Sequence, residues 1–232
     1  MSEFFLKHIT YSFIHKRLKK FTRSGINNQI INSSKFILPS HRILIVGGYG
    51  PISDLIKEVF EDNYIRELDI NSEHHPDYLI DIQDTKAMSQ IQEKYDAIFV
   101  LEVLEHLLMP QKGLENLQKL LTPDGIIIGS TPWIIPIHDR PFDFYRFTHY
   151  SLSNMIQSSK LEVVEIYCRG NYVDSVICLM FRGLKVHGIV AKVMSVLALI
   201  ISLLRLSKPK TYDTSQDACI GYSWIGKNNQ KL

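Results

Sequence analysis

The feature that most constrains the fold of this chain is an apolar run that leads directly into a glycine-rich turn and then a helix. Residues 43–46 are apolar and mostly β-branched, which is typical of a strand buried in a parallel sheet. Gly47, Gly48 and Gly50 follow, and glycines let a backbone turn tightly and approach a ligand where a Cβ would collide. Pro51 suits the first helical position, where a missing N–H costs nothing. By itself the segment fits a nucleotide-type cofactor site or a purely structural turn.

Strand and helix patterns alternate along the rest of the chain. Further apolar strands are predicted at residues 64–68, 78–80, 95–101, 126–128, 161–167 and 220–224, with helical spacing of apolar residues between most of them. Such alternation is typical of a parallel sheet with right-handed crossovers. We therefore expect an α/β fold over residues 41–232, a Rossmann-like seven-stranded sheet with helices on both faces.

Residues 1–40 are predicted to form a basic amphipathic helix and a connector. Residues 4–21 place apolar side chains roughly on one helical face, and the first 24 residues carry six basic side chains against one acidic side chain. The helix fits a lid that packs on the domain or a helix on an anionic membrane surface. Residues 24–41 are rich in Ser, Asn and Gly, which favours a connector with one short apolar piece.

A hydrophobic helical insertion is predicted before the last strand, at about residues 172–215. It contains a 17-residue, largely apolar run at residues 188–204. At about 1.5 Å per residue this run is shorter than the roughly 30 Å hydrocarbon core of a bilayer. A single span would also place the last strand across the membrane from its sheet. We therefore favour in-plane membrane contact or a buried lid, with a homodimer interface as a further alternative.

Polar and glycine residues gather where the predicted parallel strands end. In such sheets the ligand lies outside the carboxyl ends of the strands. The glycine turn, Asp69, Asp81, Glu102 and residues 130–133 all fall there. Asp69 lies 19 residues beyond Gly50, where a carboxylate grips a ribose diol in dinucleotide-binding and related folds. The edge predicts a site for a nucleoside-containing ligand, although Asp69 also fits a helix cap or a loop.

Residues 102–132 carry the most specific pattern in the chain. Glu102-Val-Leu-Glu-His106 is followed by Pro110, a Leu-rich helix, Leu121-Thr-Pro-Asp-Gly-Ile126 and Ser130-Thr-Pro132. This run is similar to that of class I S-adenosylmethionine-dependent methyltransferases of the ubiquinone-type branch, and the resemblance covers roughly residues 42–170. It implies an enzyme with S-adenosylmethionine as its cofactor. A nicotinamide dehydrogenase is disfavoured, because the glycine turn is not a clean GxGxxG.

The resemblance also implies which residues bind the cofactor. Gly47, Gly48 and Gly50 would cradle the methionine part, and Asp69 would hold the ribose hydroxyls. Asp81 and the backbone of Ile82 would meet the adenine, and Glu102 would lie beside the cofactor at the mouth of the site. The family usually has an acidic residue shortly before the glycines, where this chain has Leu44 or Ile45, and Tyr49 stands within the turn. These departures leave open a catalytically weak, membrane-associated binding module.

The segment of residues 137–148 is dense in His, Asp, Arg and aromatic residues and leaves the sheet at the ligand edge. It resembles a stretch of methyltransferases found beside glycan and cell-envelope biosynthesis enzymes. We expect a substrate wall in which Arg146 contacts a phosphate or carboxylate and aromatic rings stack. The alternative is an aromatic minicore in which Asp143 and Arg146 pair. The predicted substrate-binding residues are Trp133, Asp143, Tyr145 and Arg146.

Two histidines are candidate catalytic bases. Methyl transfer from a sulfonium needs alignment above all, whereas a hydroxyl acceptor gains from a base with a pKa near neutrality. His138 lies in the loop just described, and His106, which also fits a structural role, ends the Glu102–His106 run. His74 and His75 lack further metal-ligand spacing and are predicted to be surface residues. No metal site is expected.

Cysteine spacing and charge limit the remaining function classes. Cys168, Cys178 and Cys219 are odd in number and lack CxxC spacing, which disfavours a disulfide framework and a zinc site and suits a reducing cytosol. The net charge of +2 does not indicate a nucleic-acid partner. We expect a cytoplasmic enzyme, with peripheral contact at the inner face of the membrane as an option. Its acceptor is predicted to be a hydroxyl or amine of a lipid-linked or nucleotide-linked glycan precursor, or alternatively a small prenylated or lipid-like molecule.

Overall fold

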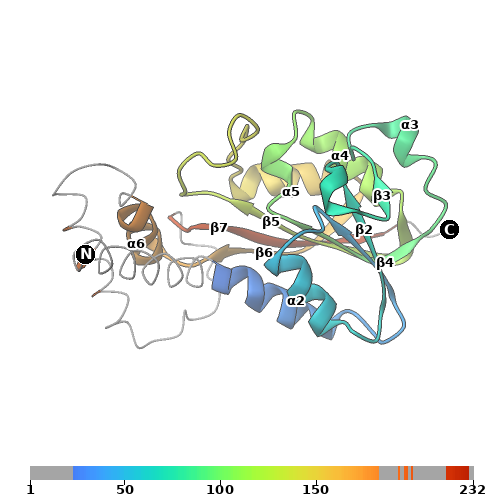
Figure 1. Cartoon of the computed structure of the whole chain (residues 1–232), viewed down its shortest axis with the longest axis horizontal. Helices are drawn as coiled ribbons and strands as arrows, with labels where there is room; N and C mark the ends of the chain where they lie inside the picture. Colours follow the sequence, from blue (N-terminus) through green and yellow to red (C-terminus); the bar gives the residue numbers. More distant parts are fainter. Residues whose placement is uncertain (1–22, 183–192, 194–195, 198–199, 201–217, 230–232) are drawn as a thin grey trace, which may run out of the picture.

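A computed structural model describes residues 23–182, 193, 196–197, 200 and 218–229 of the chain. These residues form one seven-stranded sheet with the strand order β3-β2-β1-β4-β5-β7-β6 (Figure 1). Strands β1 to β5 pair in parallel, whereas β7 runs antiparallel to both β5 and β6. This confirms the predicted Rossmann-like α/β sheet. The strands are β1 Arg42–Val46, β2 Tyr64–Asp69, β3 Tyr78–Leu79, β4 Tyr95–Leu101, β5 Leu121–Pro132, β6 Leu161–Arg169 and β7 Gly221–Asn228.

Helices cover both faces of the sheet (Figure 1). Helices α4 (Pro110–Gln118) and α5 (His149–Ser158) lie on one face, and α2 (Pro51–Val59) and a helix of residues 23–32 lie on the other. Successive strand residues point to opposite faces, so Leu44 and Ile98 pack with α4 and α5 while Ile43 and Phe99 pack with α2. Strands β1 and β4 are apolar over residues 43–46 and 97–101, because both of their faces are buried there. The short helical segments are α3 (Thr85–Met88), η1 (Ser33–Lys35), η2 (Ser72–His74) and η3 (Leu104–His106).

The last two strands form an antiparallel pair that is separated by a long insertion. They pair from Leu161 opposite Asn228 to Arg169 opposite Gly221. Helix α6 (Tyr172–Arg182) follows β6 and lies beyond the end of the sheet, away from α4 and α5 (Figure 1). The apolar run predicted at residues 188–204 lies largely outside the described residues, as does the predicted helix of residues 4–21. Within the described ranges, no helix combines the length and the apolar character needed to cross a membrane.

The connector predicted for residues 24–41 was wrong over its first part, because residues 23–32 are helical. The buried side chain of Gln29 anchors this helix to the sheet. Its Nε2 donates to Gly129 O at 2.8 Å, and its Oε1 accepts from Ser223 Oγ at 2.6 Å. These partners lie 100 and 194 positions away in the sequence. A local pattern could not indicate the helix, since it is stabilised by distant residues.

The strand predicted at residues 126–128 is longer than expected. β5 begins at Leu121, so the turn formers around Pro123 lie within the strand as an irregularity and do not end a helix there. Pairing with β4 shifts at this point, from Tyr95 opposite Leu121 to Ala97 opposite Ile126. The preceding helix α4 already ends at Gln118.

Candidate active site

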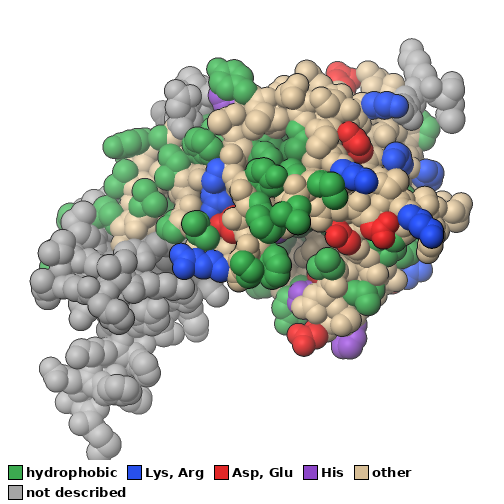
Figure 2. All heavy atoms as spheres, turned by 90° about the horizontal axis from the view of Figure 1, so that it is seen from above, with side chains coloured by type: hydrophobic (Ala, Val, Ile, Leu, Met, Phe, Trp, Pro, Cys, Tyr) green, Lys and Arg blue, Asp and Glu red, His purple; other side chains and the backbone are tan. Residues whose placement is uncertain are grey.

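The predicted site residues lie at the carboxyl edge of the parallel strands. Gly47 follows β1, Asp69 ends β2, Glu102 follows β4 and Ser130 lies near the end of β5. The loop of residues 133–148 extends from the same edge. Figure 2 shows a face of the molecule on which hydrophobic side chains surround a hollow, with acidic and histidine side chains beside it.

The glycine turn has backbone conformations that require glycine at two positions. Gly47 has a φ of 71° and Gly50 a φ of 77°, both in the left-handed region. The Gly47 N–H donates to Leu68 O at 2.9 Å, which holds the turn against β2. A Cβ added to Gly50 would meet none of the described atoms within 4 Å, so the turn borders open space at this residue.

Asp69 is the centre of a polar cluster beside the glycine turn. The Asn71 N–H donates to its Oδ1 at 2.8 Å, and His74 Nδ1 lies 2.9 Å from its Oδ2. The Tyr49 ring stacks on the His74 ring, with centroids 4.0 Å apart. The prediction that His74 is a mere surface residue was wrong, because its partly buried ring orients Asp69. A carboxylate has about four acceptor positions, so about two remain on Asp69 for a ligand.

Asp81 and Ile82 follow β3 and are fixed by the surrounding loop. The Asp81 carboxylate accepts from the Gln83 N–H at 2.8 Å. Asn116 Nδ2 on α4 donates to Ile82 O at 2.9 Å. The Ile82 side chain is buried in the core, and a contact of its backbone with adenine stays a prediction.

Glu102 follows β4 and is held by a buried arginine that was not predicted from the sequence. Its Oε1 accepts from Ser130 Oγ at 2.9 Å and from Arg169 Nη2 at 2.6 Å. Arg169 is only 3% exposed and also donates to Thr131 O at 2.9 Å. The available signal was a basic residue that directly follows Tyr167 and Cys168 at the end of a predicted strand, because a charge that is buried there needs a partner.

One bidentate ion pair holds the loop of residues 133–148. Both carboxylate oxygens of Asp143 accept from Arg146, with 2.7 Å between Oδ2 and Nη2. These bonds hold the pKa of the Asp143 carboxyl well below its usual range. Arg146 Nη1 also donates to Tyr145 O at 2.8 Å. The alternative in which Asp143 and Arg146 pair therefore describes the structure, and a substrate contact through Arg146 stays a prediction.

The aromatic residues of the loop divide into packed and exposed rings. The Trp133 N–H donates to Ile220 O at 2.8 Å, and its ring lies 6.3 Å from that of Tyr222. Tyr145 Oη donates to Leu108 O at 3.0 Å. Phe142, Phe144 and Tyr145 are exposed, although the Tyr145 ring also stacks on that of Phe147. Trp133 and Tyr145 thus support the loop, and their contacts with substrate stay predictions.

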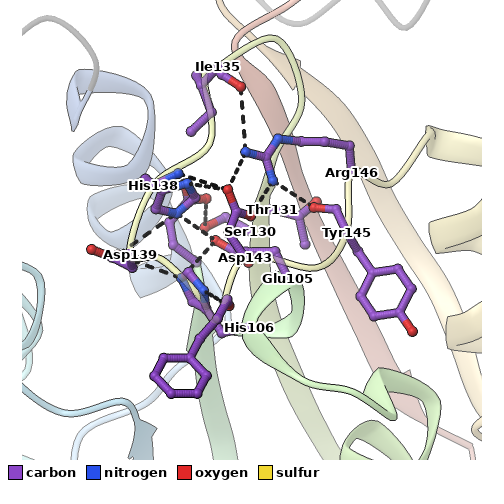
Figure 3. Close-up of polar contacts among 12 residues, drawn as sticks. Glu105, His106, Ser130, Thr131, Ile135, His138, Asp139, Asp143, Tyr145 and Arg146 are labelled. Atoms are coloured by element: carbon purple, nitrogen blue, oxygen red, sulfur yellow. Dashed lines mark hydrogen bonds and ion pairs between the residues drawn. The ribbon is translucent and has the colours of Figure 1, made fainter. Parts of the chain in front are cut away.

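His106 and His138 meet a buried carboxylate beneath this loop (Figure 3). Glu105 Oε1 lies 3.7 Å from His106 Nε2 and 3.8 Å from His138 Nε2. Burial raises the pKa of the Glu105 carboxyl. The facing Glu105 carboxylate in turn raises the pKa of His138, although desolvation of the ring acts against it. The pair therefore keeps a proton to higher pH than either group would in water.

The cluster joins both candidate bases, and Asp143 lies behind His138. Glu105 was not predicted as a site residue, although a carboxylate between Leu104 and Leu107 in an apolar segment was a signal for one. The roles of the individual glycines and acidic residues in cofactor binding stay predictions.

Comparison with known proteins yields a family and a fold. The sequence profile of a family described as a methyltransferase domain matches residues 39–164. No curated protein sequence matches the chain. A solved S-adenosylmethionine-dependent methyltransferase from Archaeoglobus fulgidus is similar with a TM-score of 0.57 and 12% identity, over 88% of this chain and 94% of that one.

Two ligand-bound structures share the same fold. Coclaurine N-methyltransferase, bound to N-methylheliamine and SAH, has a TM-score of 0.53 and 12% identity over 88% of this chain and 72% of that one. A Haemonchus contortus phospholethanolamine N-methyltransferase, in complex with phosphomonomethylethanolamine and S-adenosylhomocysteine, has a TM-score of 0.53 and 11% identity, over 88% and 53%. At these identities the similarity concerns the fold alone.

Proposed function

Because the chain belongs to the family of methyltransferase domains, we propose that it transfers a methyl group to a hydroxyl or amine of a glycan. Family membership confirms the predicted enzyme class, a class I S-adenosylmethionine-dependent methyltransferase, and S-adenosylmethionine is its cofactor. The proposed acceptor is a glycan on a lipid-linked or nucleotide-linked precursor.

The residues at the sheet edge fit S-adenosylmethionine. Gly50 borders open space and forms the N-cap of α2, and Asp69 keeps acceptor positions for a ribose diol. When bound, the cofactor supplies a methyl group on a sulfonium whose leaving group is already activated, so the protein contributes alignment above all. Glu102, oriented by Arg169 and Ser130, would lie beside it.

The single observation that carries the acceptor proposal is the cluster of Glu105, His106 and His138 beneath the loop. A hydroxyl loses its proton as it is methylated, and a base with a pKa near neutrality assists this loss. His138 has Glu105 at 3.8 Å on one side and Asp143 at 3.1 Å on the other, so two carboxylates stabilise its protonated ring. His138 is thus the proposed base, with His106 as the second candidate. Exposed Phe142 and Phe144 would stack on a sugar ring.

A second candidate acceptor is a small prenylated or lipid-like molecule. Helix α6 exposes Tyr172, Val173 and Leu179. Such apolar side chains suit an apolar acceptor or peripheral contact with the inner face of the membrane. A catalytically weak binding module is less well supported, because the Tyr49 ring is exposed and stacks on His74 outside the turn.

Calorimetry with S-adenosylhomocysteine and with NAD tests the cofactor assignment. Wild type should bind S-adenosylhomocysteine and should not bind NAD. Asp69→Ala should weaken S-adenosylhomocysteine binding by about tenfold or more, since a hydrogen bond to a charged group contributes about 1.5–3 kcal/mol. Asp62→Ala, at an exposed aspartate, is the matched control and should bind like wild type. Absence of S-adenosylhomocysteine binding in wild type would refute the assignment.

A methyl-transfer assay with three acceptors tests the substrate class. Lipid-linked glycan, nucleotide-linked glycan and prenylated molecules are offered in parallel to wild type and His138→Gln. Methyl transfer to either glycan by wild type, together with its loss in His138→Gln, supports the proposed glycan acceptor. Transfer to the prenylated acceptor alone would favour the second candidate.

A further inference from the structure

We infer that Glu105, His106 and His138 form a binding site for a divalent transition-metal ion of the zinc class. One ligand atom from each residue lies within 4.8 Å of the other two. The residues come from η3 and from the loop of residues 133–148, so only the fold brings them together (Figure 3). The role of the ion in methyl transfer rests on the proposed function, but its binding does not.

Within the described part of the chain, no regular hydrogen bond compensates the burial of the Glu105 carboxylate. The residue is fully buried, and among the described residues no hydrogen bond reaches either of its oxygens. Leaving a buried charge uncompensated is costly. Its Oε1 faces the Nε2 atoms of both histidines at 3.7 and 3.8 Å. A cation between these three atoms would supply the missing compensation.

The opposite ring nitrogens of the two histidines face oxygen atoms, as they commonly do in metal sites. His106 Nδ1 lies 2.7 Å from Phe142 O, and since a carbonyl can only accept, this nitrogen carries the proton. His138 Nδ1 lies 3.1 Å from Asp143 Oδ2, although it is not aligned for a regular hydrogen bond. Histidine ligands of metals commonly donate their other N–H to a carbonyl or carboxylate. The Nε2 atom of His106 is thereby left as a lone-pair donor that faces Glu105, and the Asp143 carboxylate favours the same tautomer of His138.

The spacing and the donor set favour a zinc-class ion. Metal–ligand bonds of about 2.0–2.2 Å in a tetrahedron separate neighbouring ligands by about 3.4 Å. The two separations from Glu105, 3.7 and 3.8 Å, exceed this value by a few tenths of an ångström, and the third lies within 4.8 Å, so the ligands would have to approach one another around an ion. Imidazole nitrogens suit zinc, copper, iron and nickel, whereas magnesium and calcium prefer oxygen ligands throughout.

Asp139 marks the open side of the site. Its Oδ2 lies 3.9 Å from His106 Nε2 and 4.0 Å from His138 Nε2, and its side chain is exposed. Three protein ligands leave a coordination position for Asp139, for water or for the oxygen of an acceptor. With an ion bound, the Nε2 atoms act as ligands, and the ion would hold the acceptor oxygen in place of a free imidazole.

Metal binding is measured on the full chain after dialysis against a chelator. Zn²⁺ is titrated against a chromogenic chelator, and Co²⁺ is used because its visible absorption reports its coordination. Wild type should bind one equivalent. Loss of a residue that only hydrogen-bonds to a metal ligand commonly lowers metal affinity by about 10–100-fold. Because Glu105 and His138 are themselves proposed ligands, Glu105→Gln and His138→Gln should each weaken Zn²⁺ binding by at least about tenfold. His75→Asn is the matched control, because this exposed residue has a left-handed φ of 50° that asparagine tolerates.

Binding of S-adenosylhomocysteine is measured on the same samples. It verifies that the variants fold, and Glu105→Gln preserves the side-chain volume. Wild type that binds S-adenosylhomocysteine but not Zn²⁺ would overturn the metal site and leave the proposed function intact. Zn²⁺ binding without S-adenosylhomocysteine binding would support the metal site and refute the proposed function. Zn²⁺ affinity that is unchanged in both ligand variants would place the ion elsewhere and overturn the inference.

Discussion

The substitution Arg169→Met removes the guanidinium that joins β6 to the mouth of the site, while it keeps much of the side-chain volume. Arg169 Nη2 donates to Glu102 Oε1 at 2.6 Å and to Thr131 O at 2.9 Å. The stem of the side chain packs close to Gly25, where an added Cβ would lie 3.2 Å from Arg169 Cβ. The substitution therefore removes a donor from Glu102 and Thr131 and leaves the stem packing in place.

The expected loss of stability follows from the burial of the pair. Removing one partner of a buried ion pair costs about 3–5 kcal/mol, because the other charge is left uncompensated. The Glu102 side chain is 22% exposed and keeps its bond from Ser130, so water offsets part of the cost. We expect the free energy of unfolding to fall by about 2–4 kcal/mol. At about 2–4 °C per kcal/mol for a chain of this size, Tm should fall by about 4–16 °C.

Urea unfolding of wild type, Arg169→Met, Glu102→Gln and the double variant measures the coupling energy of the pair. Lys227→Met is the control, because it removes an exposed ion pair in which Lys227 Nζ lies 3.0 Å from Asp124 Oδ1. That control should cost less than about 1 kcal/mol. The stabilising role of the buried pair is refuted if Arg169→Met lowers the free energy of unfolding by no more than Lys227→Met does. This comparison requires that the slope of the free energy against urea concentration is the same in both variants.

Three further substitutions probe the loop of residues 133–148, the sheet and the helix of residues 23–32. Asp143→Asn should lower the free energy of unfolding at neutral pH by about 1.5–3 kcal/mol. Because the pKa of Asp143 is lowered in the fold, this contribution is complete above its unfolded value of about 3.9 and is lost below it. Urea unfolding should show the difference shrinking below about pH 4, and a constant difference would contradict the ion pair. Gly129→Ala places a Cβ 2.0 Å from the fully buried Trp224 ring and should cost about 3 kcal/mol or more, so a wild-type Tm would refute this packing. Gln29→Ala leaves Ser223 Oγ and Gly129 O without this partner and should cost about 1–3 kcal/mol in urea unfolding, whereas unchanged stability would show that the helix of residues 23–32 is not anchored there.

Most of the sheet could be predicted because its elements carry local signals. Strands buried on both faces need apolar residues at successive positions, as β1 and β4 have. Positive φ angles at Gly47 and Gly50 require the residue type that the sequence shows there. The rule that ligands lie at the carboxyl ends of parallel strands then placed Asp69 and Glu102 at one edge.

The contacts within the site could not be predicted in the same way. His74 has the sequence context of a surface loop, yet its ring lies between Asp69 and Tyr49. Arg146 was expected to face a substrate or to pair with Asp143, and the structure shows the Asp143 carboxylate bound to both ends of its guanidinium. Residue type indicates what a side chain is able to bind, and only its neighbours in space decide what it does bind.

The sequence by itself determined the fold class, the edge at which the site is predicted and the residue types available there, because apolar periodicity and the alternation of strands and helices along the chain are local properties. Only the tertiary structure decided which groups meet. It pairs Arg169 with Glu102 across 67 positions, Gln29 with Ser223 across 194, and Glu105 with His138 beneath the loop. The physical reason is that hydrogen bonds and ion pairs depend on separations of a few ångströms between side chains. Residues far apart in the chain reach such separations only when the whole sheet has formed around them.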